Sequence, residues 1–397
     1  MSLLWAALTL QAGYNTALVT IGAAILGASA AAVGAFVLLR KRSLVSDAIS
    51  HATLPGLVLA FIAMALLWSD GRWIPGLLLG ATVSAGLGLL AVEWMARRTR
   101  LSEDAAIGAV LSAFFGFGVV LLTVVQSLNT GGQAGLSGFL VGSTASMLRS
   151  EAETIAISAA LIGLAVFALR RPFTLVAFDP GYAATRGLSL RATDLALMAL
   201  TLLVTVVGLR VAGLVLIVAL TIIPPVAARF WTDRPGRMVA IAAAIGALSA
   251  YVGTVLSALD ANMPTGALIV LVSFAVFLAS LVFSPLRGLL AGRSEARGLA
   301  RSILIRQGLL DIATGRQPEA ASLTALRRSG FLDEGGEPTA EGRRAAEDAA
   351  RDERLRAIHR RAYPAEARGL DLDLRPLADL LGPERIGELE RLGGRSA

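Results

Sequence analysis

Long apolar stretches separated by short polar connections fill the chain from residue 16 to residue 286. A helix that crosses a membrane needs about 20 consecutive, mostly apolar residues. Nine stretches meet this requirement: residues 16–39, 48–68, 73–95, 104–126, 152–169, 193–209, 211–228, 238–258 and 265–286. The pattern therefore predicts an all-α, polytopic transmembrane domain over residues 1–286.

Basic residues fall in every second connection between these stretches. The rich connections lie at residues 40–42, 97–100, 170–191 and 229–237 and after residue 286, whereas each intervening connection holds one basic residue or none. Because cytoplasmic connections of membrane proteins carry an excess of Lys and Arg, the alternation predicts an N-terminus outside and a C-terminus inside. It also supports nine spans, since a missed span would reverse it.

Composition divides the chain into an apolar part and a charged part. Of the 397 residues, 55% are hydrophobic and 16% are charged. From Arg287 to the end there are 20 Arg and 18 Asp or Glu residues. This predicts a basic linker at 287–300 and a mostly helical cytosolic tail at 301–397. The net charge of +7 is modest and shared by both parts, which fits positive cytoplasmic loops better than nucleic-acid binding.

The sequence lacks two features that would allow particular kinds of chemistry. The chain has no cysteine, so disulfides and thiolate metal sites are excluded. It also lacks the GxxxxGK[ST] motif that cradles the phosphates of ATP. We therefore expect a chain that is not an enzyme and binds no cofactor of its own. Met1–Leu10 is apolar but lacks a basic n-region, so we expect no cleaved signal peptide there.

The candidate chemistry lies at the start of the second span, where Asp47 precedes His51 by four residues. On a helix both side chains project from one face. A carboxylate oxygen and an imidazole nitrogen suit Mn²⁺, Fe²⁺ or Zn²⁺, and two ligands suit a transit site, which a second copy would complete to four. The spacing fits equally well an Asp47 that caps the helix and a His51 at the lipid–water boundary. Pro55-Gly56 is expected to weaken the helix one turn further on.

Two connections have patterns of their own. The outer connection Ser127–Ser150 is rich in glycine, which fits a short re-entrant element, an interfacial helix or a loose periplasmic loop. In the inner connection, Asp179 and Pro180 form a helix start and Gly187 a helix stop, which predicts a two-turn cytoplasmic helix.

Other charged residues in the spans have simpler explanations. Glu93 is placed to pair with Arg97 one turn later on the same helix. Glu103, Asp104 and Asp194 stand at helix starts, where capping and the helix dipole favour an acid. We assign no chemistry to these residues.

Six segments of the membrane part form a recognisable set: Leu38–Leu44 running into Ser46–Gly56, Ser102–Gly108, Phe139–Ser143, Ala177–Ala183 with Gly187, Gly213–Pro224 and Pro264–Leu271. In this order they resemble the permease subunit of the bacterial Mn/Zn/Fe ABC importers. The resemblance covers almost all of residues 16–286.

The resemblance implies a dimeric permease, with an identical or paralogous second subunit, in the bacterial inner membrane. It implies cytosolic ATPase subunits and an extracytoplasmic metal-binding protein as partners. Asp47 and His51 match the family's acid and histidine that are thought to contact the metal. The coupling helix that docks on the ATPase would comprise Phe178, Asp179, Pro180, Tyr182, Ala183 and Gly187.

One position departs from the family pattern. Some members have Asp two residues before the turn that opens the last span, whereas this chain has Asn262 there, with Asp260 nearby. Whether either residue contributes to the metal pathway stays open.

The tail resembles diphtheria-toxin-repressor-type metalloregulators, which are winged-helix proteins. The matching segments are Ala325–Leu332, Pro338–Ala346, Arg351–Leu355 and Leu381–Glu384. Glu353 stands where such regulators typically have His, and His359 is the tail's only His or Cys. The nearly balanced charge argues against DNA binding. We therefore expect a folded cytosolic appendage that stabilises assembly, and leave metal sensing open.

Two other functions compete with the ABC importer. An ion-coupled secondary transporter should carry proton-relay acids deep inside its spans, and the sequence shows none at mid-span. A non-transporting membrane scaffold with a regulatory tail would need neither the Asp47–His51 pair nor the coupling helix.

Overall fold

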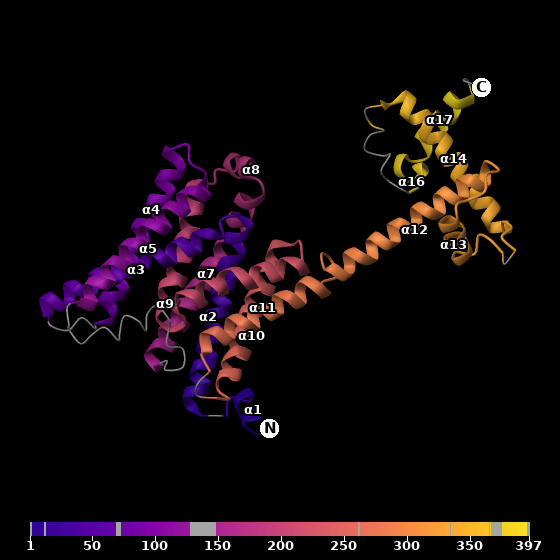
Figure 1. Cartoon of the computed structure of the whole chain (residues 1–397). Helices are drawn as coiled ribbons and strands as arrows, with labels where there is room; N and C mark the ends of the chain where they lie inside the picture. The colour runs from indigo at the N-terminus through magenta and orange to yellow at the C-terminus, as the bar shows by residue number, and fades with distance from the viewer. Residues whose placement is uncertain are drawn as a thin grey trace. The chain divides into compact units, whose positions relative to one another are not determined.

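The computed structural model describes residues 2–11, 13–68, 73–127, 148–260, 263–333, 335–364, 366 and 375–394 (Figure 1). Within these residues the fold is all-α, as predicted, and the only extended pairing is an isolated bridge between Leu332 and Pro338. The chain divides into two compact units, Met1–Leu289 and Leu290–Ala397.

The first unit holds the apolar helices. They are α1 (Ser2–Leu8), α2 (Tyr14–Leu39), α3 (Leu44–Trp68), α4 (Ile74–Arg98), α5 (Glu103–Ser127), α7 (Arg149–Phe178), α8 (Pro180–Thr185), α9 (Leu190–Trp231), α10 (Pro235–Ser257) and α11 (Thr265–Phe283). Among the described residues, nine helical segments are long and apolar enough to cross a membrane, which matches the predicted number.

The long helix α9 contributes two of these segments because it folds back on itself. Leu190–Leu209 and Ala212–Trp231 are each long enough to span. At the start of the second segment Gly213 has φ +74°, a conformation that favours glycine. A Cβ added at Gly208 would meet the side chain of Ile217 at 2.5 Å, although nine residues of straight helix rise about 13 Å. The chain therefore bends back sharply at Gly213, and the end of the first half packs against the start of the second.

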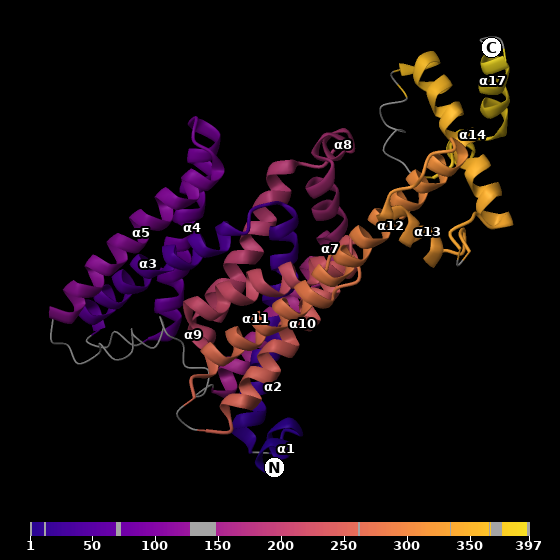
Figure 2. The same ribbon diagram turned by 45° about the vertical axis from the view of Figure 1, so that its right-hand side comes forward.

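The membrane helices form two groups that meet along α9 (Figures 1 and 2). In one group α3, α4 and α5 pack around Ile49, Val58 and Ala85. In the other, α2, α7, α9, α10 and α11 pack around a core that includes Phe36 and Ile217. Side chains of α9 enter the apolar cores of both groups.

Glycines set the closest helix contacts inside each group. An added Cβ at Gly27 of α2 would lie 2.5 Å from the carbonyl oxygen of Gly246 of α10. Likewise, an added Cβ at Gly56 of α3 would lie 2.0 Å from the carbonyl oxygen of Gly80 of α4. Such small-residue contacts let membrane helices approach backbone to backbone. The helix α3 runs unbroken through Pro55, so Gly56 serves this packing.

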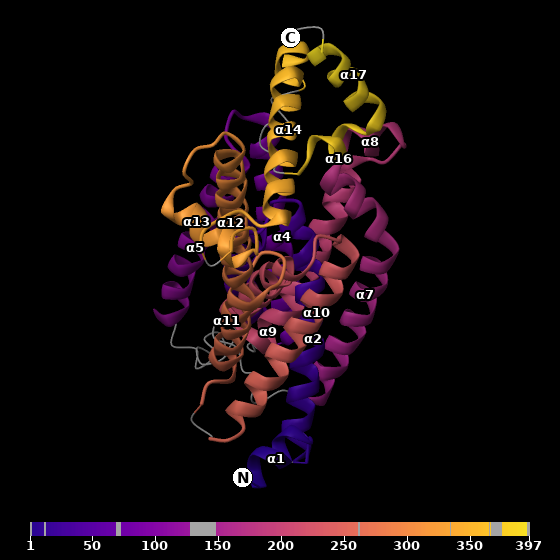
Figure 3. The same cartoon turned by 90° about the vertical axis from the view of Figure 1, so that its right-hand side faces the viewer.

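The second unit is a small helical domain. It contains α12 (Leu289–Ala313), α13 (Ala320–Arg328), α14 (Ala340–Ala362), α16 (Leu377–Leu381) and α17 (Pro383–Gly394). Figure 3 shows α14 beside α17, and the pair share an apolar core of Leu355, Ile386 and Leu389. Helix α12 begins inside the segment predicted to be a basic linker, which is therefore helical from Leu289.

Candidate metal-transit site and coupling helix

The Asp47–His51 pair lies in the first two turns of α3. Nε2 of His51 is 3.4 Å from Oδ1 of Asp47, and the imidazole ring meets Phe115 of α5 edge to face at 4.8 Å between centroids. The side chains of Asp47 and His51 are 34% and 21% exposed, whereas Ala48 and Ile49 between them are buried. Nε2 of His51 and Oδ1 of Asp47 therefore converge on the partly open face of α3.

This separation suits two ligands of one ion. Metal–ligand bonds of about 2.0–2.1 Å at a tetrahedral angle place neighbouring ligand atoms about 3.4 Å apart. Within the part of the chain that the structure describes, no group of three or more His, Cys, Asp or Glu side chains is arranged to hold a metal. Among these residues, Asp47 and His51 therefore stand as a pair, with no third side chain of this kind arranged beside them.

A cluster of four charged residues lies just before the pair, around the short connection between α2 and α3. Arg40 is ion-paired with Asp194 of α9 at 2.8 Å, and Arg42 with Glu103 of α5 at 2.8 Å and with Asp194 at 3.8 Å. Arg40 also donates a hydrogen bond of 2.9 Å to the carbonyl oxygen of Val176 in α7. We call Arg40, Arg42, Glu103 and Asp194 the charge cluster.

The sequence alone explains these acids only in part. Glu103 lies in the first turn of α5, as expected, whereas α9 begins at Leu190 and has no acid in its first turn, so Asp194 lies further along that helix than expected. The ion-pair partners of both acids were not predicted. Their arginines were interpreted only as a topology signal. The run Arg40-Lys41-Arg42 and the acids near the starts of two other apolar stretches were the signal that could have suggested ion pairs. The Glu93–Arg97 pair predicted within α4 is present.

The predicted short helix after residue 179 is present as α8. The Asp179 carboxylate accepts a hydrogen bond of 2.8 Å from the backbone N–H of Tyr182, and Pro180 occupies the first turn. Gly187 ends the segment with φ +76°. Ala183 is fully buried, whereas Phe178 and Tyr182 are 58% and 49% exposed. Two aromatic rings are thus presented on the surface around a well-capped helix.

Helix α7 is longer than the predicted span. We expected the connection to begin at Arg170, but the helix continues through Pro172 to Phe178. Burial explains the difference: Phe173 packs on Phe36 of α2 with ring centroids 5.2 Å apart, and Val176 is fully buried. Proline is tolerated in membrane helices when neighbouring groups compensate for the lost hydrogen bond.

Asp260 lies far from the Asp47–His51 pair. It follows α10, where it lines a small pocket with Asn15 and Thr16 at the start of α2. The contact between Gly27 and Gly246 shows that α2 and α10 are packed side by side, and they run antiparallel. The pair instead follows the end of α2. Asn262 and the glycine-rich part of the outer connection, residues 128–147, lie outside the described residues.

Nine apolar helices within the described ranges are typical of a multi-pass membrane protein. Residues 14–284 match the model of the ABC 3 transport family, and the chain belongs to this family. Family membership favours an ABC transport subunit over the secondary transporter and the scaffold. The tail lies outside the matched region.

Relatives and a solved structure agree with this assignment. The chain is 38% identical to the "Manganese transport system membrane protein MntC" of Bacillus subtilis (strain 168), over 75% of this chain and 67% of that protein. It is 37% identical to the "Zinc transport system membrane protein TroC" of Treponema pallidum (strain Nichols), over 72% and 94%. The structure titled "PsaBC from Streptococcus pneumoniae in complex with Fab" is similar with a TM-score of 0.60 at 28% identity, covering 70% of this chain and 95% of that chain.

Proposed function

We propose that this chain is the permease subunit of an ATP-driven importer of a divalent transition metal, Mn²⁺, Zn²⁺ or Fe²⁺, in a bacterial inner membrane. The observation that carries the proposal is the Asp47–His51 pair, whose 3.4 Å separation suits one such ion, in a member of the ABC 3 transport family. The names of two relatives, a manganese and a zinc transport protein, support this class of cargo.

The proposed permease works as a dimer with its N-terminus outside. A second permease chain, identical or paralogous, brings its own pair to the pathway and completes four ligands. The partial exposure of Asp47 and His51 supports this arrangement, because the pair remains accessible on one copy. An extracytoplasmic metal-binding protein delivers the ion, and cytosolic ATPase subunits drive the change of access.

The proposed coupling helix is α8, together with Phe178 before it and Gly187 after it. Its exposed aromatic rings are suited to a protein groove, because Tyr and Phe dominate the buried centres of such contacts. A route from α8 to the metal pair runs through the end of α7. There the carbonyl of Val176 accepts from Arg40, and the charge cluster holds the residues that precede α3.

Metal uptake in cells that also produce the partner subunits tests the ligand role. Asp47→Ala and His51→Ala should each lower uptake of radioactive Mn²⁺ or Zn²⁺ at least about tenfold at equal membrane abundance. Asp104→Ala is the matched control, since Asp104 is an exposed acid in the first turn of the neighbouring helix α5 and should leave uptake unchanged. Normal uptake by both site variants would remove the ligand role.

Docking of the ATPase on α8 has its own test. Tyr182→Asp places a charge on the exposed face of the helix and should abolish co-purification of the ATPase subunit with the permease. Thr185→Asp is a control at the last residue of the same helix, where an acid is less favourable to the helix itself. Loss of the ATPase with both variants would indicate that α8 unfolds, and retention with Tyr182→Asp would refute docking there.

For the tail we propose a winged-helix-derived appendage that stabilises the assembly. Helix α13, the bridge between Leu332 and Pro338, and helix α14 follow in the order of a helix, a short wing and a helix. Glu353 is ion-paired at 3.0 Å with both Arg306 and Arg360, so a structural role accounts for it. Removing residues 301–397 should reduce the yield of assembled complex and leave uptake per complex unchanged; a loss of metal-dependent inhibition instead would establish sensing.

A further inference from the structure

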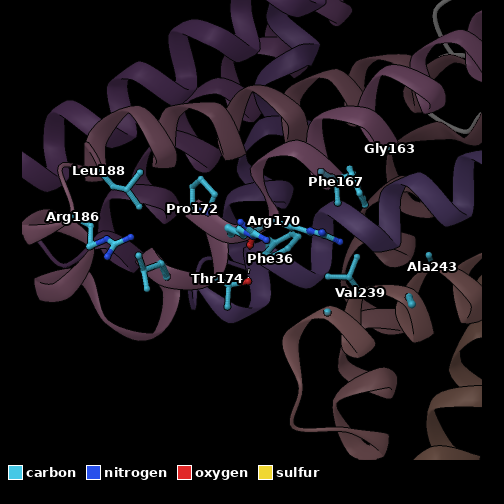
Figure 4. Close-up of a pocket in the computed structure, with 15 residues that line it drawn as sticks. Phe36, Gly163, Phe167, Arg170, Pro172, Thr174, Arg186, Leu188, Val239 and Ala243 are labelled. Atoms are coloured by element: carbon cyan, nitrogen blue, oxygen red, sulfur yellow. Dashed lines mark hydrogen bonds between the residues drawn. The ribbon is translucent and has the colours of Figure 1, made fainter.

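An apolar groove with a volume of about 960 Å³ runs between α7 and α10 (Figure 4). Phe36 of α2 lies among its lining residues, with Val166 and Phe167 from α7 and Val239 and Ala243 from α10. At Gly163 an added Cβ would meet no other atom within 4 Å, so the space beside it is open. The groove is mostly apolar, and it opens on the face of α7 and α10 that is not packed into the apolar core.

Three arginines, Arg170, Arg171 and Arg186, belong to the lining of the groove. Figure 4 shows Arg186 at one end of the lining and Arg170 near its middle. The guanidinium of Arg170 stacks over the ring of Phe167 at 4.2 Å, and that of Arg186 lies 6.0 Å from the ring of Tyr182. Within the described ranges, none of these three arginines forms an ion pair with a carboxylate, in contrast to Arg40 and Arg42.

The arginines stand where the apolar part of α7 gives way to the cytoplasmic connection. Arg170 and Arg171 directly follow the stretch 152–169, and Arg186 follows α8. This is the level at which long basic side chains reach lipid headgroups. An apolar groove lined by three arginines without carboxylate partners in the described residues suits an anionic lipid, whose acyl chain fits apolar walls and whose phosphate pairs with arginine.

We propose that this groove binds an anionic phospholipid of the cytoplasmic leaflet, with its phosphate held by Arg170, Arg171 and Arg186. Charge complementarity favours a lipid over a second permease chain. A second copy would bring its own arginines to the same membrane level, and like charges would face one another. The proposal rests on the membrane orientation given under the proposed function, and not on the metal or its pathway.

The absence of cysteine in the chain allows a direct binding measurement. A fluorophore on Ala240→Cys, inside the groove, is exposed to brominated lipids in nanodiscs that hold the assembled transporter, with the permease labelled before assembly. Brominated phosphatidylglycerol should quench it at a lower mole fraction than brominated phosphatidylcholine with the same acyl chains. The same label on Leu87→Cys, at an exposed position on α4, should not distinguish the two lipids.

The arginines account for the selectivity in this proposal. Each basic residue near an anionic membrane surface strengthens binding about fivefold. The double variant Arg170→Gln, Arg171→Gln should therefore shift the phosphatidylglycerol titration by about 25-fold and abolish the preference. Arg98→Gln is the matched control, since Arg98 is an exposed arginine at the end of α4 outside the groove, and should preserve it.

Three results would overturn the proposal. Equal quenching of the Ala240→Cys label by both lipids would show unselective acyl contact. Quenching by neither lipid would show that protein covers the groove. An undiminished preference in the double arginine variant would place the selectivity elsewhere. Because none of these readings involves metal uptake, a failure here is distinct from a failure of the importer assignment.

Discussion

Separating Arg40 from Asp194 should loosen the helix bundle around the connection between α2 and α3. The two side chains are 17% and 7% exposed and lie 2.8 Å apart, and the residues are 154 positions apart in the chain. Asp194→Asn keeps the shape of the side chain and removes its charge. Arg40→Gln removes the partner charge and also the hydrogen bond to the carbonyl of Val176.

The size of the effect follows from burial. Removing one partner of a buried ion pair costs about 3–5 kcal/mol, because the other charge stays desolvated. Arg42, 3.8 Å from Asp194, offsets part of that loss in Arg40→Gln. In Asp194→Asn, the amide oxygen of the introduced side chain still accepts a hydrogen bond from Arg40. We therefore expect about 2–3 kcal/mol for each single variant, and a coupling energy of about 1–2 kcal/mol between them.

The assay is thermal unfolding of the detergent-purified permease, with both single variants and the double variant in one cycle. A loss of about 2 kcal/mol lowers the midpoint by roughly 4–8 °C for a unit of this size. Arg98→Gln serves as the control, since this exposed arginine forms no ion pair within the described residues and should leave the midpoint unchanged.

Additive losses of stability in the double variant would refute the predicted coupling between Arg40 and Asp194. If the double variant loses the sum of the two single losses, Arg40 and Asp194 do not act on each other, and the charge cluster is a collection of independently solvated groups. A double variant less damaged than that sum supports a buried, coupled pair.

Three further variants test the packing, the tail and the short helix. Gly246→Leu should prevent folding or lower the unfolding midpoint by more than about 10 °C, because its Cβ would lie 2.3 Å from the carbonyl oxygen of Gly27, and size-exclusion chromatography with thermal unfolding will show this. Asp352→Asn should destabilise the tail by about 2–4 kcal/mol, because that carboxylate is ion-paired with the buried Arg356, and limited proteolysis will report faster cleavage there and not in the membrane unit. Asp179→Ala should cost the short helix about 1 kcal/mol through loss of its N-cap and weaken ATPase stimulation by the permease, whereas Asp179→Ser should restore both.

The spans, the short helix α8 and the Asp47–His51 contact could be predicted from the sequence, because each is determined by residues close together in the chain. The spans follow from apolar length, and α8 follows from a cap, a proline and a glycine within nine residues. The Asp47–His51 pair is likewise a contact within one helix. Each of these features depends on residues that are at most a few helical turns apart in the sequence. It can therefore be predicted without knowing how distant segments pack.

Contacts between distant segments could not be predicted in this way. The chain order does not indicate which acid Arg40 meets, or that Phe115 of α5 lies against His51. The continuation of α7 past Pro172 also depends on a distant residue, since Phe173 is buried against Phe36. A single sequence shows which residues are polar at a helix start, but the fold decides which of them come together.

The two glycine contacts divide the membrane unit into parts of unequal stiffness. Where backbones touch, as at Gly27 with Gly246 or Gly56 with Gly80, one helix cannot slide past the other without a clash. Between the two helix groups, the contacts to α9 are made by side chains such as Met198 and Leu209, which can repack. Any alternation of access should therefore be concentrated along α9. A pair of spin labels on α3 and α9 would then change distance during ATP turnover, whereas a pair on α3 and α4 would keep a constant one.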